Sequence, residues 1–152
     1  MSDKMIKNDM ETLKHIQKVR ENIFKMILEL EQRMLLHDRS KLESPEREIF
    51  GEHYEELGKV EYGSPEYTTL LEKVKPAIDH HYSKNSHHPE FYKNGINDMN
   101  LVDVLEMLMD WLAATERNKN GNIRKSIEHN TGRYGMAPQL AQIMQNTINR
   151  YF

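Results

Sequence analysis

One stretch, LVDVLEMLMDWLAA at residues 101–114, constrains the fold of this chain more than any other. Its residues are apolar except for three carboxylates, Asp103, Glu106 and Asp110. Side chains three, four and seven positions apart share one face of an α-helix, so these carboxylates form a single stripe and apolar side chains cover the rest. Such a helix lies inside a domain, where ionised carboxylates need a cation or hydrogen-bond donors. Ion pairs with Lys or Arg on a neighbouring helix would meet this need, and a bound metal ion is the alternative.

Apolar residues elsewhere recur at three- and four-residue spacing, which predicts an all-α protein with six or seven helices in a single domain over residues 1–152. Ser44 and Ser64 each precede a proline, the pattern of an N-cap followed by proline at the first helical position. Loops are expected at residues 58–63, 79–98 and 131–135, and no strand, repeat or low-complexity segment is evident. The predicted helices span residues 8–36, 45–57, 65–78, 101–118, 123–129 and 137–151.

Composition narrows the classes of partner and cofactor. The net charge of −3 argues against general nucleic-acid binding and against a polybasic membrane contact. No apolar run approaches the roughly 20 residues of a membrane span, and the N-terminus lacks the apolar core of a signal peptide, so we expect a cytoplasmic protein. The chain has no cysteine, so nitrogen and oxygen atoms must hold any metal, which suits Mn, Fe, Co, Ni, Zn or Mg.

Histidines gather at three places where they could meet the carboxylate stripe. His37-Asp38 directly follows an apolar stretch and should lie at the edge of the core. Two HisHis pairs, at 80–81 and 87–88, flank a polar segment, and a solvated loop is the alternative interpretation of them. Ile78 continues an apolar row, so His81 is expected to face inward rather than His80. His15 falls beside the apolar face of the first predicted helix, whereas His53 and His129 are interpreted as surface or structural residues.

The order of these motifs resembles the HD-domain superfamily of metal-dependent phosphohydrolases, whose members are all-helical. HDRSK at 37–41 is similar to the HD-x-x-K signature, and MDWLAA at 109–114 is similar to the helix whose aspartate completes the metal site. Together with TLKH at 12–15, HHYSKNSHH at 80–88 and the tail SIEHNTGRYGMAPQLAQI, the chain also resembles an uncharacterised family of small phage and bacterial proteins. This narrower resemblance covers roughly residues 12–150.

The resemblance implies a site for one or two divalent metal ions. It assigns the minimal one-metal site to His15, His37, Asp38 and Asp110, with His81 and one or both of His87 and His88 as ligands of a further ion. His80, Asp103 and Glu106 are additional ligands or orient the ligating histidines. HD domains turn between the first histidine and the His-Asp doublet, so we expect a break near Leu28–Gln32. Without it, one straight helix would place His15 roughly 33 Å from His37, and His15 would not bind the same ion.

The resemblance also implies hydrolysis of a phosphoester, with a nucleotide or related small phosphate compound as substrate. The ion would polarise a phosphoryl oxygen and lower the pKa of bound water. Asp38 would bridge metal and water or act as general base, and Lys41 and Arg117 would contact phosphate, although ion pairs are an equal alternative for both cations. Two other classes stay open: a protein that sequesters a nucleotide without turnover, and a helical interaction module. The sequence leaves a homo-oligomer open as well.

Overall fold

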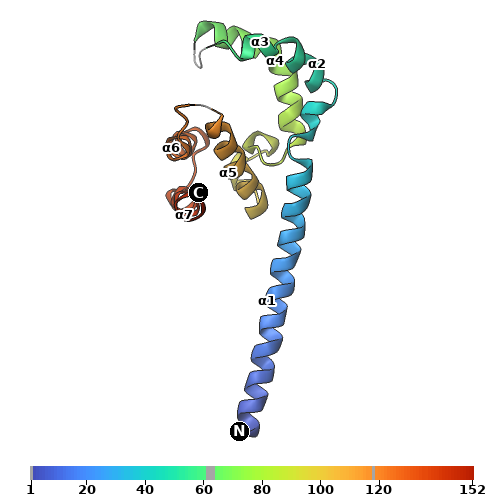
Figure 1. Cartoon of the computed structure of the whole chain (residues 1–152), viewed down its shortest axis with the longest axis vertical. Coiled ribbons are helices and arrows are strands. Elements are labelled where there is room, and N and C mark those ends of the chain that lie inside the picture. The colour runs from blue at the N-terminus through green and yellow to red at the C-terminus, as the bar shows by residue number, and fades with distance from the viewer. Residues whose placement is uncertain (1, 61–63, 118) are drawn as a thin grey trace. The chain divides into compact units, whose positions relative to one another are not determined.

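The computed structural model describes residues 2–60, 64–117 and 119–152. The described residues form seven α-helices and three short 3-10 helices and no strand, which confirms the all-α prediction (Figure 1). The chain divides into two compact units, Met1–Leu36 and His37–Phe152. A single domain over residues 1–152 therefore stays a prediction. Among the described residues, no helix combines the length and the apolar character needed to cross a membrane.

The first unit is a single helix, α1, which runs without interruption from Asp3 to Leu36 (Figure 1). The predicted break near Leu28–Gln32 is wrong, because this segment contains no Gly or Pro and is rich in residues that favour helix. His15 is exposed and lies about 31 Å along α1 from Leu36, at about 1.5 Å per residue. The condition for His15 to bind the same ion as His37 is therefore not met, and we remove His15 from the candidate ligands.

The second unit begins with the 3-10 helix η1 (Arg39–Leu42), followed by α2 (Glu46–Glu52) and α3 (Tyr54–Leu57). These two short helices replace the one helix predicted over residues 45–57, and Ser44 does not cap α2, whose N-cap residue is Pro45 without a side-chain cap bond. The loop predicted at 58–63 lies partly outside the described residues.

Helix α4 (Pro65–Lys84) starts as predicted, since the Ser64 hydroxyl accepts a hydrogen bond of 3.0 Å from the backbone N–H of Tyr67. It extends past its predicted end and carries His80 and His81, which were expected in a loop. The rest of that predicted loop contains two more 3-10 helices, η2 (Pro89–Phe91) and η3 (Gly95–Asp98). The first HisHis pair therefore lies on the last turns of α4, and the second pair follows shortly after the end of this helix.

Helices α5 (Leu101–Glu116), α6 (Ile123–Tyr134) and α7 (Pro138–Tyr151) supply the hydrophobic core. Asn100 and Asp103 form a reciprocal capping box at the start of α5. Helix α6 continues through the loop predicted at 131–135 and stops at Gly135, whose positive φ of 61° favours glycine. On α7, Met144 and Ile148 are buried, whereas Ile143 is 60% exposed. The main buried cluster consists of Met107, Leu108, Ile127, Met136, Met144 and Ile148.

Candidate metal centre

Asp38 occupies an unusual backbone position in the second unit. Its φ of 55° and ψ of 16° place it in the left-handed region, and it is the only non-glycine residue with positive φ among those the structure describes. Glycine is the usual residue after a helix in this conformation, because a Cβ atom costs about 1 kcal/mol or more there. Asp38 adopts this conformation despite the cost, and its carboxylate lies beside the histidines of α4 and of the segment that follows α4.

Three groups of potential ligands converge around this carboxylate. Within each group, the nitrogen and oxygen atoms on offer all lie within 4.8 Å of one another. The first group draws on the start of η1, on α4 and on the second HisHis pair, and the other two reach the carboxylate stripe of α5. The groups are Asp38 with His81, His87 and His88; His37 with His87 and Glu106; and His37 with Asp38 and Asp110.

Two of the atoms that face one another in the first group are acceptors that receive no hydrogen bond. Nε2 of His81 lies 2.9 Å from Nε2 of His88 and 3.2 Å from Oδ1 of Asp38, and Nε2 of His87 lies 3.5 Å from the same oxygen. Oδ1 of Asp38 and Nε2 of His87 are buried and make no hydrogen bond. Ligands at 2.0–2.1 Å from one metal ion lie roughly 2.9–3.3 Å apart, so these residues fit a shared cation.

Glu46 fixes the orientation of the first HisHis pair. This glutamate is completely buried, and its two carboxylate oxygens accept hydrogen bonds from Nδ1 of His80, at 2.7 Å, and Nδ1 of His81, at 2.9 Å. A carboxylate can only accept, so Nδ1 of His81 carries the hydrogen and Nε2 presents its lone pair toward Asp38. His81 is 4% exposed and His80 is only partly buried, as the apolar row ending at Ile78 predicts.

Glu106 fixes the orientation of two other histidines, His37 and His87. Its Oε1 lies 2.9 Å from Nδ1 of His37 and 3.2 Å from Nδ1 of His87, so in the neutral rings Nε2 is left without a hydrogen. Nε2 of His37 then lies 3.6 Å from Oδ2 of Asp38 and 3.7 Å from Oδ1 of Asp110. The carboxylate stripe of α5 therefore contributes two residues to the site. Glu106 lies beside the Nδ1 atoms of His37 and His87, and Asp110 lies beside Nε2 of His37.

Electrostatics keep the carboxylates ionised and the partly buried His88 neutral. Burial alone would raise the pKa of Glu106, but hydrogen bonds from His37 and His87 lower it to about 2. Burial likewise opposes ionisation of Asp38, yet the hydrogen bond and charge of Lys41, together with the charge of His37, bring its pKa well below the usual range. Burial lowers the pKa of His88 to about 3, so its ring keeps a free lone pair.

His37 responds in the opposite direction to the same carboxylates. The carboxylates of Asp110 and Glu106, which lie beside its two ring nitrogens, raise its pKa to about 10. Protonation of this ring is one way to place a positive charge between acceptor atoms, and a bound cation is the other. A metal ion that binds Nε2 of His37 must therefore displace a proton.

The remaining predicted residues lie at or beyond the edge of this cluster. Asp103 is fully buried and accepts hydrogen bonds from Ser86, at 2.8 Å, and Tyr92, at 2.7 Å, so it ties the second HisHis segment to α5 and belongs to none of the three groups. Lys41 donates to Oδ2 of Asp38 at 2.6 Å. Arg117 is exposed at the C-terminal end of α5, two turns beyond Asp110.

Sequence reasoning missed two residues of the site. Glu46 reads in the sequence as an ordinary acidic residue in the first turn of a helix, and nothing in its neighbours marks it as buried. Asn85 donates 2.8 Å hydrogen bonds to the Ser40 hydroxyl and to the backbone carbonyl of His81, which joins η1 to the end of α4. Its position between the two HisHis pairs was the one available signal.

Replacing Glu46 by glutamine is expected to weaken metal binding about 10- to 100-fold, because the amide cannot accept from both histidines with two oxygens. The measurement is a metal titration by calorimetry, with folding monitored by circular dichroism. Glu48→Gln changes an exposed glutamate of the same helix and should leave the affinity unaltered. Equal affinities for Glu46→Gln and the unmodified chain would show that Glu46 does not orient the ligands.

Comparisons with known proteins place the chain in a family without assigning its chemistry. No curated protein and no solved structure is similar enough to the chain to match. One family model, described as a family of unknown function (DUF5662), matches residues 4–150 and so spans nearly the whole sequence, including every residue of the candidate metal centre. The chain therefore belongs to the DUF5662 family.

Proposed function

We propose that this protein is a metal-dependent phosphohydrolase of the HD-domain type that cleaves a phosphoester of a nucleotide or a related small phosphate compound. The observation that carries the proposal is the set of buried acceptor atoms around Asp38. Oδ1 of Asp38 and Nε2 of His87 have no hydrogen-bond donor, while Nε2 of His81 and Nε2 of His88 lie beside them. Aspartate oxygen with imidazole nitrogen is a donor set that suits Zn, Mn, Fe, Co or Ni.

The two oxygens of Asp38 face different groups of ligands, which supports one ion or two. Oδ1 faces His81 and His87, whereas Oδ2 lies 3.6 Å from Nε2 of His37. Asp110 completes the second group. A divalent ion held by these residues would polarise a phosphoryl oxygen and lower the pKa of nearby water.

The residues around the ligands support binding of a negatively charged substrate. The side chains of His37, Asp38 and Asp110 keep 31%, 23% and 28% of their surface exposed, so the site is open to solvent on this side. Nζ of Lys41 lies beside Oδ2 of Asp38 and its side chain is 43% exposed. Lys41 can turn toward a phosphate oxygen without leaving the site, and it is the cation nearest to the ligands that would balance the charge of the substrate.

The test combines metal analysis with a hydrolysis screen. Protein purified without chelator should contain about one or two equivalents of metal and hydrolyse at least one compound in a panel of nucleoside monophosphates, triphosphates and cyclic dinucleotides. Asp38→Asn should lower kcat/KM by a factor of about 1,000 or more, because it removes a ligand and a charge. Asp79→Asn alters an exposed carboxylate on α4 and is the matched control. Bound metal and bound nucleotide without any turnover would favour sequestration instead.

A further inference from the structure

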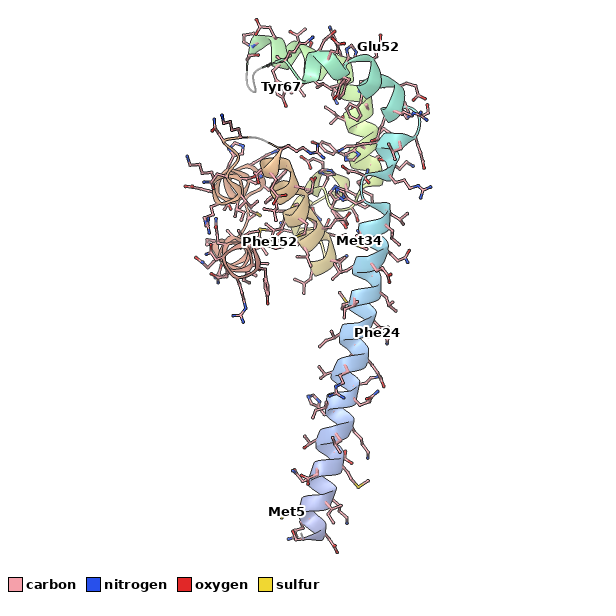
Figure 2. The ribbon with its side chains drawn as sticks, viewed as in Figure 1. Met5, Phe24, Met34, Glu52, Tyr67 and Phe152 are labelled. Atoms are coloured by element: carbon pink, nitrogen blue, oxygen red, sulfur yellow. The ribbon has the colours of Figure 1, made fainter. Side chains whose placement is uncertain are left out.

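Helix α1 carries a long apolar seam that nothing in the first unit covers. With Ile6 at the first position of a seven-residue repeat, the first and fourth positions form one line along the helix. None of the residues of α1 is buried. Figure 2 shows the side chains along this helix and labels Met5, Phe24 and Met34. The apolar residues of this line that are clearly exposed are Ile6, Leu13, Ile16, Ile23, Ile27 and Met34.

The sides of the seam are apolar, and the opposite face of the helix is charged. Apolar side chains border the seam on both sides, namely Met5, Met10, Val19, Phe24 and Met26. The opposite face carries charged residues, among them Lys4, Lys7, Glu11, Lys14, Lys18, Lys25 and Glu29. A broad apolar face backed by a charged one is typical of a helix that packs against another helix.

Two charged residues, Asp9 and Arg20, interrupt the seam, and their spacing selects one arrangement. Asp9 and Arg20 lie at equal distances, in opposite directions along the sequence, from the midpoint between Lys14 and His15. The same midpoint relates Ile6 to Ile23. Two copies of α1 that run in opposite directions about this midpoint therefore bring every seam residue from 6 to 23 opposite a suitable partner.

In this antiparallel register, Ile6 faces Ile23 of the partner subunit, and Leu13 faces Ile16 of the partner subunit. Asp9 faces Arg20 of the partner subunit, and the two-fold symmetry repeats each pair. A parallel pair would instead place Asp9 against the partner's Asp9, which puts like charges in an apolar seam. Charged residues within such a seam specify register and direction, because the wrong arrangement leaves them unpaired.

We propose that two copies of this chain associate through α1 as an antiparallel pair, with the reciprocal Asp9–Arg20 contacts setting the register. This interaction is independent of the metal centre, whose residues all belong to the second unit. The seam from residue 6 to residue 23 spans about 26 Å of helix, at about 1.5 Å per residue. It gives the exposed apolar side chains of α1 between residues 6 and 23 one occupant, a second α1.

The first test uses the full chain and charge reversal. Sedimentation equilibrium should show a dimer for the unmodified protein, and Asp9→Arg should weaken it at least about a hundredfold by opposing two arginines twice. The double variant Asp9→Arg with Arg20→Asp exchanges the charges and should restore the dimer. Glu11→Arg makes the same change of charge on the outer face and should have no effect. A monomeric unmodified protein, or a double variant that stays dissociated, would overturn the proposal.

The second test reads direction through disulfides, which the absence of cysteine makes clean. Ile6→Cys and Ile23→Cys are made as separate full-length proteins, mixed and oxidised. The antiparallel register predicts a cross-linked dimer only in the mixture, because two copies of Ile6→Cys hold their thiols roughly 25 Å apart. Cross-linking of Ile6→Cys with itself would indicate a parallel pair and contradict the register.

Discussion

Replacing Asp38 by glycine is expected to abolish metal binding while changing the stability of the metal-free protein by no more than about 1 kcal/mol. The substitution removes the Cβ atom from a residue at φ 55°, which is worth about 1 kcal/mol. It also removes a carboxylate whose low pKa reflects stabilising interactions with Lys41 and His37, and the lost contact with partly exposed Lys41 offsets the backbone gain by at most about 1 kcal/mol. The melting temperature in EDTA should therefore stay within about 2–4 °C of that of the unmodified protein, and added metal should no longer raise it.

Two further substitutions separate the backbone effect from the charge effect. Asp38→Asn keeps a side chain that tolerates the left-handed region and removes only the charge, so in EDTA it should melt below Asp38→Gly. Asp79→Gly places the same glycine in the middle of α4, where it should cost about 0.5–1 kcal/mol. Differential scanning calorimetry in EDTA measures all three. An Asp38→Gly protein whose melting temperature still rises with added metal would show that Asp38 is not a ligand.

The carboxylate stripe of α5 shows what periodicity can predict about this site. Helical spacing alone places Asp103, Glu106 and Asp110 on one face, and in the structure two of them, Glu106 and Asp110, lie beside the histidines. The division of roles along the stripe was beyond the sequence. Asp103 caps α5 and holds Ser86 and Tyr92, because it lies at the third position of the helix where a free backbone N–H is within reach.

Other features depended on contacts between residues distant in sequence. Glu46 is 35 residues from His81, and its burial results from the packing of α2 on α4, which no local pattern encodes. The HisHis pair at 80–81 was assigned to a loop because it is polar, yet it continues α4, since tertiary hydrogen bonds to Glu46 satisfy both rings. The break in α1 came from a family resemblance rather than from the residues, which contain no breaker.

Adding a divalent metal to protein stripped with EDTA is expected to raise the melting temperature by about 5–10 °C. A ligand at 100 times its Kd stabilises the native state by about 2.7 kcal/mol, and each kcal/mol shifts the melting temperature of a chain of this size by about 2–4 °C. Zn, Ni and Co should act at lower concentrations than Mg, because imidazole nitrogens dominate the donor set around Asp38. A thermal-shift titration of each metal, repeated after chelation, measures the effect and its reversibility.

His87→Gln provides the sharpest variant for this titration. His87 is 1% exposed and belongs to two of the three ligand groups, so its loss removes a buried nitrogen from both at once. Glutamine preserves a side chain that can donate to Glu106, which limits the damage to packing, but it cannot supply the lone pair of Nε2. We expect the metal-induced shift to fall by at least half, whereas His129→Gln, at an exposed position on α6, should retain all of it. If His87→Gln kept the full shift, the metal would be binding elsewhere, and the buried acceptors around Asp38 would need another explanation.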